Sequence, residues 1–385
     1  MAIIERSKLL EAVTWAGKVA ATMPRGVGQN IHLACSEGCL TVRALGGEGS
    51  FSVRMPCEGE PWEAWLGAQA SAKVLRSIKG TEVEVEGADN GVTVKWGKRK
   101  VRVGAPGSES LDPIPVFELP PKWQIQIWGH YLARLLSRVN VTVSSDATRE
   151  HLSGVALLPG PDGLGAVSTD GHRLHKASES ATCDDGDGRA VWALLPGFAG
   201  RLLEHVTTRL VKAKWDSTGG AVLVGLDDGW LTVKIAIQDD SEVTYRVRVI
   251  DSRFPPYEKV IPYGHSTMVR MDLVRFVEAV KLAGDLSPGT NSGIKLGVNG
   301  NGLAVLVDDS ETGVDLEEHV EGEVTGDIPV DHYGFNAGYL LDALRRMGSS
   351  EVTAKLCDSL DPLVLEVVDG EPGERFLAVV MPLRL

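Results

Sequence analysis

The chain has 385 residues, enough for roughly two or three ordinary domains, and 43% of them are hydrophobic, so most of it can be globular. No run approaches the roughly 18 consecutive apolar residues of a membrane span, and Glu5, Arg6 and Lys8 interrupt the place where a signal peptide is apolar. The five cysteines are scattered and lack zinc spacing, which favours reduced thiols and a cytoplasmic protein without a metal. The net charge of −13 argues at first against a nucleic-acid partner.

In chain order, apolar residues at three- and four-residue spacing predict six helices, which begin near Ser7, Gln69, His130, Gly197, Met271 and Ala337. Alternating strands with a tight turn between them predict five hairpins. The turns lie at Gly38, Asn90-Gly91, Asp162-Gly163, Asp228-Gly229 and Asn301-Gly302. The fold class is therefore α+β, rich in antiparallel sheet.

The spacing of these elements predicts an internal repeat. The distances from the six helix starts to the turns at Gly38, Gly91, Gly163, Gly219, Gly302 and Asp361 are 31, 22, 33, 22, 31 and 24 residues, so long and short alternate three times. Three domains with two helices each are expected, over residues 1–121, 122–262 and 263–385. Prolines mark both junctions: Pro113, Pro115, Pro120 and Pro121 at the first, and Pro255, Pro256 and Pro262 at the second. The alternative is a mixed α+β protein without a true repeat.

The charges are segregated between the helices and the rest of the chain. The six windows 7–21, 69–79, 130–140, 197–212, 271–283 and 337–347 sum to +9, which leaves −22 elsewhere. Lysines and arginines on exposed helix faces can simply be solvated, but enrichment in an acidic chain favours one basic layer that contacts phosphates without reading bases. The residues expected to contact DNA are Lys73, Arg76, Arg134, Arg138, Arg201, Arg209, Arg275 and Arg345.

Motifs of catalysis are missing from the sequence. It contains no Walker A sequence, G-x-S-x-G elbow, H-E-x-x-H pair or dinucleotide fingerprint. The acidic loop Asp184–Gly188 lacks EF-hand spacing and favours a solvated loop. No cofactor is expected, and a binding protein is favoured over the enzyme alternative, a hydrolase that uses Asp170 and His172.

Four segments carry a resemblance to a known family. They are Thr169–Leu174 (TDGHRL), Arg253–Tyr257 (RFPPY) leading to Pro262, Gly334–Leu344 (GFNAGYLLDAL) and Val379–Leu385 (VVMPLRL). In order and spacing they resemble the bacterial sliding clamp, the beta subunit of DNA polymerase III. The resemblance is specific over residues 125–385, whereas residues 1–120 fit by repeat length and helix–hairpin order and carry few diagnostic residues. It implies three clamp domains per chain, a head-to-tail homodimeric ring around double-stranded DNA, and processivity without catalysis.

The resemblance also implies a cleft for short linear motifs of the polymerase III catalytic subunit and the clamp loader. Carried over by position, the cleft contains Leu152, Thr169, Gly171, His172, Arg173, Leu174, Pro255, Lys259, Val260, Asn336, Tyr339, Leu360, Val379, Met381, Pro382, Leu383 and Arg384. Two departures stand out: Lys259 replaces the usual Arg, and the loop Arg25–Gly28 lacks the usual prolines. A diverged clamp paralogue with a resistance or repair role stays open. So does a ligand- or peptide-binding repeat protein without a DNA role.

Overall fold

The chain was analysed as a computed structural model, in which the described residues are 1–23, 30–88, 91–105, 114, 120, 122–184, 191–212, 216–237, 239–262, 264–287, 292–309, 313–327, 332–367 and 374–384. Some features predicted above lie outside these residues. They are Asn90, the Arg25–Gly28 loop, residues 185–188 of the acidic loop, Leu385, and Pro113, Pro115 and Pro121 of the first junction.

All six predicted helices are confirmed, and each begins within two residues of its predicted start. Among the described residues they are α1 (Arg6–Ala20), α2 (Ala68–Ser77), α3 (Gly129–Val139), α4 (Gly197–Lys212), α5 (Leu273–Leu286) and α6 (Ala337–Leu344). Side chains cap two of them: Asp272 accepts from the backbone N–H of Arg275, and Asn336 from that of Tyr339. None of these described helices is long and apolar enough to cross a membrane.

The strands confirm the five hairpins as the antiparallel pairs β2–β3, β7–β8, β11–β12, β16–β17 and β20–β21. Gly229 shows why glycine follows Asp at such a turn, since its φ is 73°. The strands before the third helix are β1 (Ala2–Glu5), β2 (Asn30–Ser36), β3 (Cys39–Gly46), β4 (Gly49–Pro56), β5 (Glu58–Gly59), β6 (Trp62–Gly67), β7 (Glu82–Ala88), β8 (Gly91–Trp96), β9 (Arg99–Gly104) and β10 (Ile125–Trp128).

The later strands continue the same pattern of short antiparallel segments. Up to the fifth helix they are β11 (Gly154–Gly160), β12 (Gly163–Thr169), β13 (Arg173–Glu179), β14 (Thr182–Cys183), β15 (Ala193–Pro196), β16 (Ala221–Asp227), β17 (Trp230–Ala236), β18 (Glu242–Arg248) and β19 (Thr267–Asp272). The remainder are β20 (Gly293–Asn299), β21 (Gly302–Asp309), β22 (Val314–Gly326), β23 (Tyr333–Asn336), β24 (Glu351–Leu356), β25 (Leu363–Val367) and β26 (Arg375–Val380).

The order of elements contains one pattern six times. A strand leads into a helix, and three strands follow it. The six helices with their three following strands are α1 with β2–β4, α2 with β7–β9, α3 with β11–β13, α4 with β16–β18, α5 with β20–β22, and α6 with β24–β26. Two such half-repeats make one predicted domain, which agrees with the spacing in the sequence.

Residue contacts divide the chain into two compact units. The first contains residues 1–133 and 201–249, and the second contains residues 134–200 and 250–385. This division cuts through residues 122–262, so the expected domain boundaries stay a prediction. Each unit contains three half-repeats, those of α1, α2 and α4 in the first and those of α3, α5 and α6 in the second.

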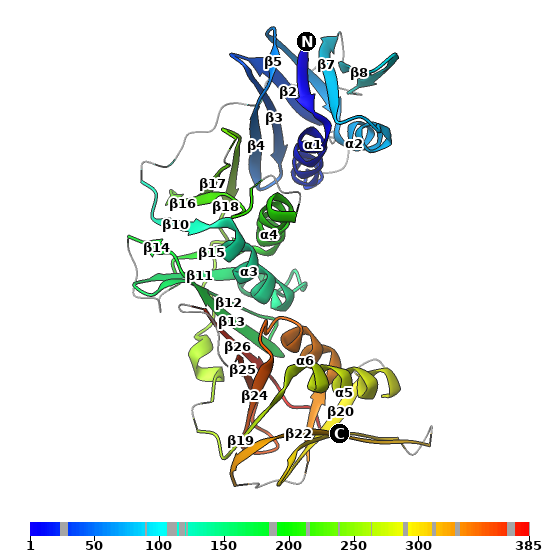
Figure 1. Ribbon diagram of the computed structural model, residues 1–385. Helices are drawn as coiled ribbons and strands as arrows, with labels where there is room; N and C mark the ends of the chain where they lie inside the picture. Colours follow the sequence, from blue (N-terminus) through cyan, green and yellow to red (C-terminus); the bar gives the residue numbers. More distant parts are fainter. Residues whose placement is uncertain are drawn as a thin grey trace. The chain divides into compact units, whose positions relative to one another are not determined.

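The first unit contains a sheet of order β5-β1-β7-β8-β9 and a second sheet in which β10-β16-β17-β18-β4-β3-β2-β6 are neighbours. In it α1 packs on α2, β3 and β4, and Figure 1 shows the two helices together beside these strands. The pair β4–β18 joins a strand of the first predicted domain to one of the second, with Phe51 opposite Tyr245. Both side chains are buried, so this junction has an apolar core.

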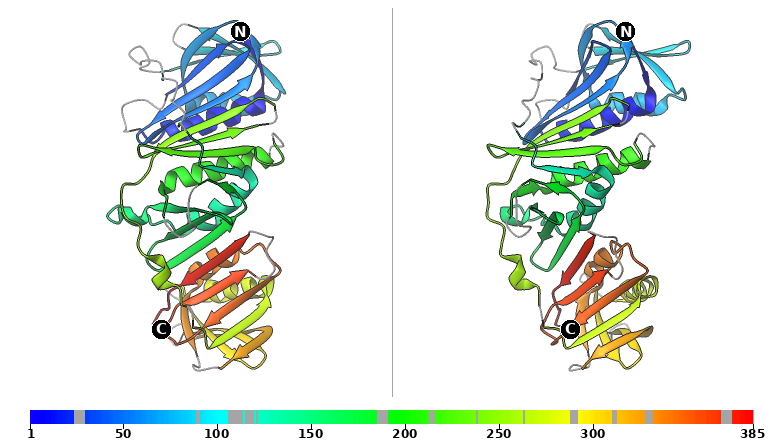
Figure 2. Two further views of the ribbon diagram at one scale, coloured as in Figure 1. Left: turned by 90° about the vertical axis from the view of Figure 1, so that its left-hand side faces the viewer. Right: turned by 60° about the vertical axis from the view of Figure 1, so that its left-hand side comes forward.

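The second unit is built on one sheet of order β15-β11-β12-β13-β26-β25-β24-β19-β22-β21-β20-β23. Figure 2 shows the C-terminal strand β26 beside β13, which joins the second predicted domain to the third. Helices α5 and α6 pack on each other. A buried core crosses the β13–β26 pair and includes Leu174, Val379, Val364, Phe254 and Tyr257.

Candidate functional site

The turn before β13 is held by its own side chains. The Asp170 carboxylate accepts hydrogen bonds from the backbone N–H groups of His172 (2.9 Å) and Arg173 (3.1 Å). The Thr169 hydroxyl donates to the Arg173 carbonyl (2.7 Å) and accepts from the N–H of Gly171 (3.1 Å). Asp170 therefore caps the turn, which gives it a structural reason to be there without acid–base chemistry.

This turn meets two segments of the third predicted domain. The His172 ring stacks on Tyr339 of α6 with centroids 6.4 Å apart, and the Arg173 guanidinium carbon lies 4.4 Å from the Tyr339 centroid. Arg173 also bonds the carboxylate of Asp342 at 2.5 Å. The backbone N–H of Met381 donates to the His172 carbonyl at 2.9 Å. The structure thus brings together predicted cleft residues that are more than 160 positions apart.

The apolar residues predicted for the cleft lie at different depths. Leu174 and Val379, paired across β13 and β26, are 2% and 1% exposed and belong to the buried core. Leu152 is also buried, at 6% exposed, whereas Val260 and Leu360 are 41% and 62% exposed. Leu174 and Val379 can therefore act only as the floor of a binding surface, and the exposed pair as its rim.

The remaining cleft residues lie in the C-terminal segment and around it. Met381, Pro382 and Leu383 are partly exposed, and the N–H of Leu383 donates to the carbonyl of Gly334 at 2.8 Å. The Asn336 carboxamide oxygen caps α6 by accepting from Tyr339 at 3.0 Å. Pro255 is partly exposed, and Lys259 and Arg384 are exposed.

Most of the predicted DNA-contacting residues are accessible. Five are classed as exposed, namely Lys73, Arg76, Arg201, Arg275 and Arg345. Arg275 lies 3.6 Å from the Glu278 carboxylate, so part of its charge is neutralised. Arg209 is partly exposed and forms an ion pair with Glu11 of α1.

Arg138 corrects one prediction. Its position four residues after Arg134 placed both on an outward polar face of α3, but Arg138 is 2% exposed. Its guanidinium bonds the carboxylates of Glu179 (3.3 Å) and Glu374, and donates to the carbonyls of Arg346 and Met347 (3.2 Å each). That face of α3 packs against the residues that follow α6 and the segment before β26, so Arg138 is not available for a phosphate.

Arg134 lies at the edge of the same cluster. Its side chain is 31% exposed and contacts Glu179 at 2.6 Å and Glu374 at 3.2 Å. Two arginines and two glutamates therefore connect α3, β13 and the segment before β26. Paired and hydrogen-bonded charges of this kind tolerate burial that a lone charge would not.

His175 is the most deeply buried titratable group of the second unit that we describe, with 0% exposure. Its Nδ1 lies 2.6 Å from the Arg138 carbonyl, which can only accept, so Nδ1 carries the proton. Within the described part of the chain Nε2 has no hydrogen-bond partner. Burial lowers the pKa of His175 to about 4, so the ring is neutral at neutral pH.

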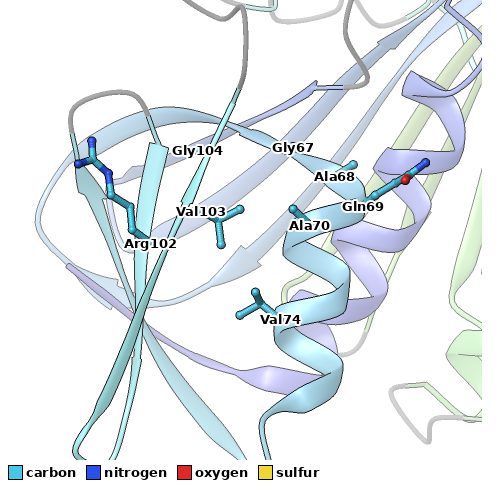
Figure 3. Close-up of a pocket in the computed structure, with 8 residues that line it drawn as sticks. All are labelled: Gly67, Ala68, Gln69, Ala70, Val74, Arg102, Val103 and Gly104. Atoms are coloured by element: carbon cyan, nitrogen blue, oxygen red, sulfur yellow. The ribbon is translucent and has the colours of Figure 1, made fainter.

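A pocket of about 410 Å³ lies on the first unit, between the start of α2 and the end of β9. Figure 3 shows Ala70 and Val74 of α2 facing Val103 of β9, with Arg102 at the other side of the strand. Its lining is mostly apolar, and its two polar side chains, Gln69 and Arg102, do not form a catalytic group. Such a surface is suited to an apolar side chain of a partner.

Comparison with known proteins agrees with this arrangement. The family model for the DNA polymerase III beta subunit, C-terminal domain, matches residues 258–384. The beta sliding clamp of Pseudomonas putida is 26% identical over 388 aligned positions, covering 99% of both chains, and that of Caulobacter vibrioides is 29% identical over 267, covering 68% of this chain and 66% of its own. The crystal structure of the DNA polymerase III beta subunit from Pseudomonas aeruginosa superposes with a TM-score of 0.82 at 25% identity, covering 100% of each chain.

Proposed function

We propose that the chain is a member of the bacterial beta sliding clamp family, to which it is similar over its full length. As such it encircles duplex DNA as a head-to-tail homodimer, tethers the polymerase and has no catalytic activity of its own. The ring is supported by the way in which the third strands of the half-repeats, the last of the three that follow each helix, pair with one another. Inside the chain, the third strand of a domain's first half-repeat pairs with that of the next domain's second half-repeat, as β4–β18 and β13–β26.

The same rule leaves one pair of strands without a partner of this kind. They are β9, at the edge of its sheet, and the first part of β22, which in the described structure is paired only with β21 on one side. A second copy could satisfy both by repeating the rule. Such a heterologous contact must close into a ring or continue as a filament.

The charges of these two edges are complementary. Arg99, Lys100 and Arg102 of β9 are exposed, and so are Asp315, Glu317 and Glu318 of β22. The helices next to these edges offer apolar surface for the same contact. Helix α5 exposes Leu282 and Leu286, at 43% and 40%, and the apolar pocket lies at the start of α2 beside β9. Basic against acidic strands would give affinity and fix orientation.

Complementary charge reversal tests the ring. A variant with Arg99, Lys100 and Arg102 changed to Glu should be monomeric, and so should one with Asp315, Glu317 and Glu318 changed to Lys. Mixed together, they should form a dimer of about twice 41.2 kDa by analytical ultracentrifugation, because both interfaces then pair opposite charges. Monomers in the mixture, or dimers of either variant alone, would contradict the proposed interface.

For DNA we propose loose, sequence-independent phosphate contact through Lys73, Arg76, Arg201, Arg209, Arg275 and Arg345, with Arg134 at the margin. The dimer should stay on nicked circular DNA and slide off linear DNA. Arg201→Glu with Arg345→Glu should flatten the dependence of DNA affinity on salt, because fewer counterions are released. Arg54→Glu, an exposed residue on β4, is the matched control. Equal retention on both DNA forms would refute a topological clamp.

For protein partners we propose that the predicted cleft binds a short linear motif with a Gln side chain and apolar residues. A fluorescent pentapeptide, Gln-Leu-Ala-Leu-Phe, is a suitable probe. Met381→Ala should weaken its binding at least about tenfold, the loss of roughly 1.4 kcal/mol of contact. Met268→Ala, at a methionine of β19 that is 40% exposed, should not. Equal affinities for the two variants would refute this site.

A further inference from the structure

Arg173 is committed to other groups of the protein. Its side chain is only 10% exposed, and all three guanidinium nitrogens already donate. Nε bonds Asp170 at 3.0 Å, Nη1 bonds Asp342 at 2.5 Å, and Nη2 bonds the carbonyl of Val141 at 3.1 Å. The plane is further covered by the Tyr339 ring. A group so occupied has little capacity left for a bound peptide.

Asp342 is held from both sides. Opposite Arg173, the Arg346 guanidinium lies 3.6 Å from the Asp342 carboxylate and donates to the Asp342 carbonyl at 2.7 Å. The same guanidinium donates from Nε to the carbonyl of Ser137 on α3 at 2.8 Å. Asp342 lies three residues after Tyr339, and side chains at this spacing share one helix face. The pair Arg173–Asp342 therefore fixes where the Tyr339 ring lies relative to the turn.

We infer that Arg173, Asp342 and Arg346 are positioning residues, which set the distance between His172 and Tyr339 and so preform the peptide cleft. This inference rests on the proposed function of the cleft. It differs from the family expectation, which makes Arg173 a direct peptide contact. The two roles predict opposite effects at Asp342: direct contact predicts unchanged or tighter binding once Arg173 is released, and positioning predicts weaker binding.

The test measures anisotropy of the labelled Gln-Leu-Ala-Leu-Phe peptide on full-length protein. Asp342→Asn should weaken binding about tenfold, within the range by which residues remote from a ligand alter affinity. Arg173→Met should weaken it similarly, and the double variant should be no worse than the worse single, because one interaction is lost in each case. Glu366→Gln, which removes the Lys355–Glu366 pair at 2.6 Å in the same unit, should leave affinity unchanged.

Hydrogen exchange without peptide separates positioning from a general loss of structure. Asp342→Asn should speed exchange in the turn 169–174 and in α6, while β20 and β21 keep wild-type rates. Wild-type affinity in Asp342→Asn, or additive losses in the double variant, would overturn the inference and leave the cleft intact. Failure of the wild-type protein to bind the peptide would instead overturn the proposed cleft, and the inference with it.

Discussion

Replacing His175 by glutamine should remove a defined part of the acid sensitivity of folding. The imidazole is fully buried and neutral, and its Nδ1–H donates to the Arg138 carbonyl. A glutamine amide can supply a similar N–H donor but does not titrate. Because burial lowers the pKa of His175 in the folded chain to about 4, the unfolded chain binds more protons at any pH below its ordinary value of 6.5.

The sign and size follow from proton linkage. Where the unfolded state binds more protons, stability rises with pH, so this contribution is complete above about pH 6.5 and is lost progressively toward pH 4. From about pH 7.5 to about pH 5 the loss for one such histidine is roughly 2 kcal/mol. His32 and His265, whose pKa values burial also lowers, are present in both proteins and cancel in the comparison.

The assay is urea unfolding followed by far-UV circular dichroism at these two pH values. Wild-type protein should lose about 2 kcal/mol more than His175→Gln on acidification, even if the variant is less stable at neutral pH. His332→Gln, at an exposed position of the same unit, should behave like wild type. Equal acid losses in wild type and His175→Gln would refute the assignment of a buried neutral ring.

Three further outcomes are expected. Arg138→Met should lower the free energy of unfolding by about 3 kcal/mol, the low end of the range for a broken buried ion pair, because Arg134 still contacts both Glu179 and Glu374. DNA retention should stay unchanged where the protein is folded, and the reverse pattern would restore Arg138 as a DNA contact. Asn336→Ala should cost about 1 kcal/mol and Asn336→Asp much less, because either amide or carboxylate oxygen can cap α6; thermal unfolding that shows equal losses would contradict the cap. Burial and the Cys35 thiol raise the pKa of Cys57 to about 12. Iodoacetamide labelling of Cys57 in the folded protein, followed by mass spectrometry, should therefore be roughly a thousandfold slower than that of an ordinary thiol near pH 8, and its rate should rise with pH. A labelling rate independent of pH would argue against this.

The sequence was sufficient for features that depend on near neighbours. Helix starts and hairpin turns follow from apolar period and turn residues within a few positions, and the repeat of a two-helix unit follows from their spacing. The capping role of Asn336 was also readable, since it directly precedes the predicted helix at Ala337. The family resemblance assigns this residue to peptide binding only.

Features set by distant partners were not readable. The helical period placed Arg138 and Arg134 on one face correctly, but it carries no information on what covers that face. The answer lies in Glu374 and in the end of α6, more than 200 residues later. The Arg173–Asp342 pair likewise spans 169 positions. Asp342 lies in Gly334–Leu344, one of the four segments that resemble the family, yet no local pattern marks it as a partner of Arg173.

The opposite charges of the β9 and β22 edges also limit which incorrect strand pairings the chain can form. An exposed strand edge has unpaired N–H and C=O groups, which can pair with any other edge, including the same edge of a second copy. Two β9 edges would set three cations against three, and two β22 edges would set acid against acid, so symmetric face-to-face assemblies are repelled. The same residues that would favour a correct neighbour thereby discourage aggregation of newly made, still single chains.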